Sequence, residues 1–204
     1  MVTARIGRRS VIVGAGLLMG AARAARAAPA KPRVVIKTNH GSILVELEAE
    51  KAPITSTNFL RYVDTQAYDG GSFYRAVKDP DAPGAGTIVG APNPKIHPFP
   101  PIHHESTTKT GLRHVAGTIS LGRFAPGTAT NNFFICAGDE PYLDAHPGEP
   151  GDNLGYAAFG QVVEGMEVVH RILNLPTDGK TQYASQRGEW LKPKVPILSM
   201  RRPG

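Results

Sequence analysis

The hydrophobic pattern of the chain begins with two short strand-like runs. Residues 34–38 and 42–47 are rich in β-branched residues, and residues 39–41 between them tolerate the positive φ of a hairpin turn. Every second residue from Ile43 to Leu47 is apolar, which is the period of a strand with one buried face. The pattern therefore predicts an opening β-hairpin.

Two other segments carry apolar residues at helical spacing. Pro53 is suited to the first turn of a helix, and the apolar side chains that follow it cluster on one side as far as the turn residues 68–71. These side chains are Ile54, Phe59, Leu60 and Val63. A second helix is predicted at about residues 164–173. Its apolar side holds Met166, Val169, Ile172 and Leu173.

The rest of the chain consists of short apolar segments separated by Gly and Pro, of which the sequence holds 23 and 18. Many short strands with only two helices favour a mainly β fold, a closed or nearly closed antiparallel β-barrel. Residues 78–104 are too rich in Pro and Gly for a regular element, so we expect a long surface loop there. A second long loop is expected at residues 144–152.

The single cysteine, Cys136, lies in an apolar run and is expected to be buried and unpaired.

The first thirty residues have the pattern of an export signal. Basic residues precede an apolar stretch at 11–22, and a small-x-small cleavage pattern follows at 25–27. The apolar stretch is shorter than the roughly 20 residues of a membrane span, so no stable membrane insertion is expected. The adjacent pair Arg8-Arg9 resembles a twin-arginine signal, and an ordinary secretory signal is the alternative.

This interpretation predicts an export signal over residues 1–30, cleaved near Ala27, and one domain over residues 31–204 in the periplasm or outside the cell.

Five of the 23 Lys and Arg residues and none of the 17 acidic residues lie before Ala28, so the rest of the chain has a net charge of +1. A nearly neutral domain lacks the basic surface that binds phosphate backbones, and no nucleic-acid partner is expected. About 175 residues are enough for one core, and we expect a monomer.

Three motifs carry a resemblance to a known family. They are Gly71-Ser72-Phe73-Tyr74-Arg75, the segment 117–138 with its Asn132-Phe133-Phe134-Ile135, and Phe159-Gly160-Gln161-Val162-Val163 at the start of the segment 159–169. In type, order and approximate spacing they resemble the motifs of the cyclophilins, and the resemblance covers nearly everything from Val34 to the C-terminus. It implies a barrel of about eight strands with a helix over each open end. It also implies a cofactor-free peptidyl-prolyl cis/trans isomerase that binds proline-containing polypeptides.

The resemblance also implies a set of site residues. Arg75 matches the catalytic arginine, a residue type that is always charged and presents rigid N–H donors to the imide nitrogen of the substrate. Phe134 matches the floor of the proline pocket, and Phe133 is expected to face the opposite way by strand alternation. The remaining substrate-binding candidates are Phe73, Tyr74, Asn132, Tyr142, Leu143 and Tyr156.

The chain departs from the family pattern at several site positions. Tyr74 and Asn132 stand where the family usually has histidine and glutamine. After Arg75, the glutamine that positions the arginine is missing, and the aromatic wall has no certain substitute. We expect these departures to affect the turnover rate more than the fold.

Two other functions remain as alternatives. One is a cyclophilin-type module that binds proline-containing segments as a folding helper with little turnover. The other is a metal-binding protein that uses the histidines between His97 and His114. These histidines lack the compact spacing of metal ligands, so solvated loop side chains and no metal are expected.

Overall fold

The structure is a computed structural model that describes residues 1–3 and 30–203. Within the described part of the chain, Lys31 and the residues after it form one compact unit. Nearly all of the predicted export signal, with the Arg8-Arg9 pair and the cleavage site near Ala27, lies outside the described residues. In the described part of the chain, no helix has the length and apolar character needed to span a membrane.

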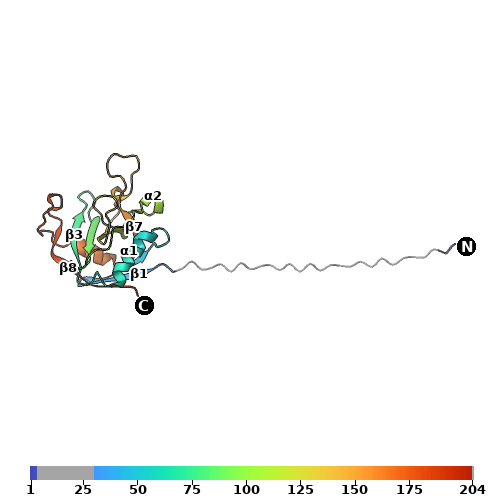
Figure 1. Ribbon diagram of the computed structural model, residues 1–204, viewed down its shortest axis with the longest axis horizontal. Coiled ribbons are helices and arrows are strands. Elements are labelled where there is room, and N and C mark those ends of the chain that lie inside the picture. The colour runs from blue at the N-terminus through green and yellow to red at the C-terminus, as the bar shows by residue number, and fades with distance from the viewer. Residues whose placement is uncertain (4–29, 204) are drawn as a thin grey trace. The chain divides into compact units, whose positions relative to one another are not determined.

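Eight antiparallel strands among the described residues close into a barrel (Figure 1). They are β1 (Arg33–Thr38), β2 (Gly41–Leu47), β3 (Ser72–Lys78), β4 (Gly86–Ala91), β5 (Thr118–Leu121), β6 (Phe133–Cys136), β7 (Ala157–Glu164) and β8 (Trp190–Arg201). Their order around the barrel is β1-β2-β7-β5-β6-β4-β3-β8, and β8 completes the ring by pairing with both β1 and β3. The predicted closed antiparallel barrel is confirmed, and closure removes exposed sheet edges.

Three α-helices accompany the barrel within the described range: α1 (Pro53–Asp64), α2 (Thr107–Thr110) and α3 (Met166–Leu173). Two 3₁₀ turns, η1 (Pro141–Leu143) and η2 (Ala184–Gln186), lie in the connections. The sequence predicted α1 and α3 but not α2. With four residues, α2 is too short to show a hydrophobic period, and it is bounded instead by the Ser106 side chain and by Gly111 in the left-handed region.

The predicted hairpin and the core face of α1 are present with one difference. Ile43 and Leu47 on β2 are fully buried, as the alternation predicted. On α1, Phe59 is fully buried, but Ile54 is 42% exposed. Ile54 shares the solvent side of the helix with Arg61, because residues seven apart lie on one helical face.

The prediction of a structureless loop over residues 78–104 is wrong, because β4 lies within it. This strand pairs with β3 on one side and with β6 on the other. Its glycines read as loop residues in the sequence, but Gly90 has a packing role. A Cβ at Gly90 would lie 2.5 Å from the Phe133 ring, so only glycine lets this ring cover the strand.

Strand alternation separates two apolar clusters. The barrel interior holds a group of aromatic rings that includes Phe59, Tyr68, Phe73, Phe133 and Phe159. The outer cluster consists of Val89, Phe134 and Cys136, with Tyr74, Leu143 and Tyr156 packed against it. The expected burial of Cys136 and the opposite orientations of Phe133 and Phe134 are therefore confirmed. The outer cluster forms the base of the candidate site.

Candidate active site

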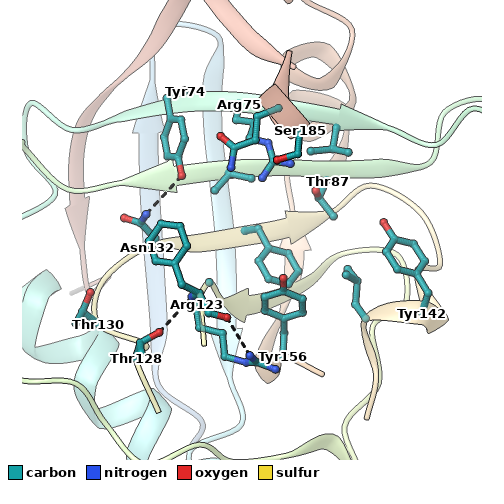
Figure 2. Close-up of a pocket in the computed structure, with 17 residues that line it drawn as sticks. Tyr74, Arg75, Thr87, Arg123, Thr128, Thr130, Asn132, Tyr142, Tyr156 and Ser185 are labelled. Atoms are coloured by element: carbon teal, nitrogen blue, oxygen red, sulfur yellow. Dashed lines mark hydrogen bonds between the residues drawn. The ribbon is translucent and has the colours of Figure 1, made fainter. Parts of the chain in front are cut away.

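A pocket of about 570 Å³ lies over the outer cluster (Figure 2). Strands β3, β4 and β6 supply its base, and loops between the strands supply its walls. The residues that line it are Tyr74, Arg75, Val77, Thr87, Val89, Gly122, Arg123, Phe124, Thr128, Thr130, Asn132, Phe134, Tyr142, Leu143, Tyr156, Ser185 and Gln186.

A bulge in β3 brings Tyr74 and Arg75 to the same side of the strand. In the pairing with β4, Phe73 lies opposite Gly90 and Arg75 lies opposite Val89, so one residue of β3 is extra. A regular strand would turn Arg75 toward the barrel interior, whereas a bulge shifts the alternation by one residue. Both side chains therefore line the pocket, as Figure 2 shows.

The floor of the pocket is apolar and well supported. Phe134 meets the Tyr156 ring edge to face, with ring centroids 5.3 Å apart. Leu143 from η1 packs beside them. An apolar floor with an aromatic wall is suited to a small saturated ring, which gains free energy by leaving water.

A hydrogen-bonded histidine lies directly behind this floor. The His114 ring stacks on Phe134 at 5.7 Å, and its Nδ1 and Nε2 lie 2.7 Å from Asp144 Oδ1 and 2.9 Å from Ser120 Oγ. The carboxylate can only accept, so Nδ1 donates to it and Nε2 accepts from the Ser120 hydroxyl. Burial lowers the pKa of His114 below its ordinary value of 6.5, and the hydrogen bond to Asp144 offsets part of that effect.

His114 was expected to be a solvated loop side chain, and this expectation is wrong because the residue is only 1% exposed. Its burial follows from the position of Asp144 and Ser120, which satisfy both ring nitrogens away from water. Across the described residues, no three His, Cys, Asp or Glu side chains are grouped so that they could hold a metal ion.

Arg75 forms an ion pair with Glu189, a residue in the connection between α3 and β8. The Nε atom of Arg75 lies 2.7 Å from Glu189 Oε2, and Nη2 lies 2.6 Å from the same oxygen. The two side chains are 24% and 25% exposed. This contact joins residues 114 positions apart, and no sequence motif indicated it.

The upper side of the pocket offers polar groups from β3 and from the segment before β6. Asn132 Nδ2 lies 3.4 Å from the Tyr74 hydroxyl, the contact dashed in Figure 2. This distance is long for a hydrogen bond, so both groups keep capacity for other partners. Burial raises the pKa of Tyr74 above its ordinary value, and its phenol is neutral at physiological pH.

Arg123 supports the opposite wall and was not among the predicted site residues. Its Nε donates to the Gly155 carbonyl at 2.9 Å, and its Nη2 donates to Asp152 at 2.8 Å. The guanidinium lies 5.3 Å from the centre of the Tyr156 ring, and the side chain is only 4% exposed. Arg123 thus ties the 144–152 loop to the pocket wall.

The structure brings together seven of the eight predicted site residues. Arg75, Tyr74, Asn132, Phe134, Tyr142, Leu143 and Tyr156 all line the pocket. Phe73 does not line it. Its side chain is fully buried in the barrel and packs against Phe133 at 5.6 Å, because it precedes the bulge and points inward. The expectation that Phe73 contacts substrate is therefore corrected.

Further lining residues were missed by sequence reasoning. Thr87 and Val89 belong to β4, which the sequence did not reveal as a strand. Ser185 and Gln186 come from η2, more than a hundred positions after Arg75. The run of β-branched residues Thr87, Ile88 and Val89 was the available signal for β4, and no local pattern indicated η2.

Comparisons with known proteins all identify the same family. The family model described as cyclophilin type peptidyl-prolyl cis-trans isomerase/CLD matches residues 33–202. A peptidyl-prolyl cis-trans isomerase of Acinetobacter baylyi is 36% identical over 171 residues, which cover 83% of this chain and 84% of the relative. Peptidyl-prolyl cis-trans isomerase B of Escherichia coli is 34% identical over 145 residues, with 71% and 85% covered.

Among solved structures, a cyclophilin type peptidyl-prolyl cis-trans isomerase of Cryptosporidium parvum has the same fold. It was determined in the presence of the dipeptide Ala-Pro. The TM-score is 0.66 at 20% sequence identity, and the match covers 84% of this chain and 99% of the other.

Proposed function

The chain belongs to the cyclophilin-type family of peptidyl-prolyl cis/trans isomerases, and from this premise we propose that it accelerates X-Pro isomerisation in exported proteins as they fold. Its relatives are isomerases, and the fold and pocket agree with this activity. The role in exported proteins is supported by the sequence of residues 1–30 alone.

The observation that carries the proposal is Arg75 beside an apolar floor. Isomerisation breaks no bond and needs only a less conjugated C–N bond, whose barrier is about 18–20 kcal/mol. In our proposal the proline ring rests on Phe134, and an N–H of Arg75 donates to the imide nitrogen as it becomes pyramidal. Donors that are already oriented toward the developing lone pair stabilise the transition state more than the ground state.

The polar residues of the pocket are proposed to hold the substrate backbone. Asn132 offers both a donor and an acceptor to an extended peptide, and the Tyr74 hydroxyl lies beside it. Leu143, Tyr142 and Tyr156 would enclose the proline ring from the side. The reaction needs no proton transfer and no cofactor. We propose that a monomer is active, because one copy of the chain supplies both the Arg75 guanidinium and the apolar floor of the pocket.

Binding without fast turnover is the second candidate, and one observation favours it. Val89 lies opposite Arg75 on β4, so the neighbouring strand presents no carboxamide to the arginine there. If Arg75 were poorly oriented, the protein would bind proline-containing segments and isomerise them slowly. Rate and affinity must therefore be measured separately.

A protease-coupled assay on a short X-Pro peptide tests the proposed function. The parent protein should accelerate isomerisation, and Arg75→Ala should remove most of the acceleration. Arg123, the other described arginine of the pocket lining, cannot replace it, because its side chain is only 4% exposed and is held by the Gly155 carbonyl and by Asp152. Circular dichroism should show an unchanged fold, since Arg75 is outside the barrel core. An Arg75→Ala protein as active as the parent would refute the catalytic role of this residue.

A binding measurement separates the two candidates. Titration of the same peptide into the parent and into Arg75→Ala should give similar affinities if Arg75 acts in the transition state. Peptide binding by a parent protein that gives no acceleration would favour the binding module.

A further inference from the structure

Arg75 has an acidic partner that comes from outside the three motifs. We propose that Glu189 is a positioning residue that fixes the Arg75 guanidinium for isomerisation. This inference rests on the catalytic role proposed for Arg75. It concerns how the side chain is oriented in a chain that carries valine, not an amide, at the opposing position of β4.

The geometry of the ion pair leaves a defined part of the guanidinium free. Glu189 Oε2 accepts from Nε at 2.7 Å and lies 2.6 Å from Nη2. A guanidinium carries five N–H donors, so the two on Nη1 and one on Nη2 remain for substrate. Arg75 has no other side-chain hydrogen bond or ion pair to the described residues. The Glu189 carboxylate therefore determines which N–H donors of Arg75 remain available, and it limits the rotation of the guanidinium group.

The backbone holds Glu189 in place relative to β3. The Ala76 amide donates to the Glu189 carbonyl at 2.8 Å, and Arg75 is paired with Trp190 where β3 meets β8. The Trp190 ring packs on Tyr74 at 5.1 Å, so the residue after Glu189 is anchored to the same pocket. The carboxylate is thus attached to the strand that carries Arg75.

A carboxylate partner also changes what Arg75 contributes. The ion pair is only partly exposed, and the negative charge beside Nε offsets the positive charge of the guanidinium. Catalysis would then depend on the direction of the remaining N–H donors more than on net positive charge. A neutral acceptor of the same shape at position 189 should preserve this direction, because an amide oxygen also accepts hydrogen bonds.

The test compares Glu189→Ala and Glu189→Gln with the parent, using the full chain and the X-Pro peptide assay. Glu189→Ala should lower kcat about tenfold, the effect of a modest loss of transition-state stabilisation, with little change in KM. Glu189→Gln should retain most of the parent kcat. Asp178→Ala is the matched control, because it removes an acid of the same connection that pairs with Lys192 and lies outside the pocket lining. The control should have the parent kcat.

Three results would overturn the proposal. They are a Glu189→Ala protein with the parent kcat, equal losses in Glu189→Ala and Glu189→Gln, and a loss of kcat matched by Asp178→Ala. A direct readout is the Arg75 Nε–H signal in NMR spectra, which should be protected from exchange in the parent and in Glu189→Gln and lose this protection in Glu189→Ala. If Arg75→Ala is inactive while Glu189→Ala is fully active, only the positioning role fails. If Arg75→Ala is fully active, the role proposed for Arg75 fails first.

Discussion

At the scale of single residues, burial decided the role of His114. In the sequence it is one of several histidines in a region rich in Pro and Gly. In the folded protein its ring is enclosed between the floor residue Phe134 and the partners Asp144 and Ser120. A histidine with both nitrogens satisfied away from water favours its neutral form.

This burial predicts how stability changes with pH. The pKa of His114 is lowered in the folded protein by burial, so the unfolded chain binds a proton at higher pH than the folded protein does. The unfolded state is therefore favoured as the pH falls through about 6.5, and the free energy of unfolding should decrease. Urea unfolding should show a smaller decrease between about pH 7.5 and about pH 5.5 in His114→Gln than in the parent.

The exposed residue His97 provides the control, since His97→Gln changes an imidazole that faces solvent and should follow the parent over the same range. An identical pH dependence in His114→Gln and the parent would show that His114 does not titrate differently in the two states.

At the scale of elements, β6 presents two phenylalanines to two environments. Phe133 is fully buried against Phe73 and Tyr68 in the barrel, whereas Phe134 supports the pocket floor outside it. The side chains of a strand alternate between its faces, so adjacent residues serve packing and binding separately.

The two substitutions should therefore have different effects. Phe133→Ala should lower the free energy of unfolding by about 3–5 kcal/mol, the cost of removing a buried ring and leaving a cavity. Phe134→Ala should leave the protein folded and weaken X-Pro peptide binding about tenfold or more, because the proline ring loses about 1.5–3 kcal/mol of apolar burial. Chemical denaturation and peptide titration measure the two quantities.

Each variant is the control for the other. Unfolding of Phe134→Ala together with a folded, non-binding Phe133→Ala would mean that the two faces of β6 have been interchanged.

At the scale of the whole molecule, all the barrel strands and the pocket belong to one compact unit, Lys31–Gly204. The sequence before it predicts export and cleavage near Ala27. The barrel closes where β1 pairs with β8, and both strands belong to this unit.

Export by the twin-arginine route should fail when Arg8 and Arg9 are both replaced by lysine, since the receptor of that route recognises the arginine pair and not its charge alone. The measurement is the appearance of the shortened protein outside the cytoplasm. Replacing Arg23 and Arg26 by lysine is the control, because these arginines lie outside the pair and their substitution should leave export intact. Normal export of the protein with both Arg8→Lys and Arg9→Lys would favour an ordinary secretory signal.

Much of this organisation could be predicted without the structure. Alternation identified β1 and β2, and helical spacing identified α1 and α3. The family resemblance located seven of the seventeen residues that line the pocket, with Arg75 and Phe134 among them. β4 was missed because Gly86 and Gly90 are typical of loops when read locally. Phe73 was misassigned because its neighbours Tyr74 and Arg75 both face the pocket, and strand alternation cannot show where a bulge occurs.

The sequence by itself determined the barrel class, the apolar faces of its strands and helices, and the family to which the site belongs, because these depend on local periodicity and on the type and order of residues. The tertiary structure alone decided how the site is assembled. The bulge that turns Arg75 outward, the burial of His114 behind Phe134, and the approach of Glu189 to Arg75 each depend on segments far apart in the chain. Barrel closure brings these segments together, and no local pattern contains the distances between them.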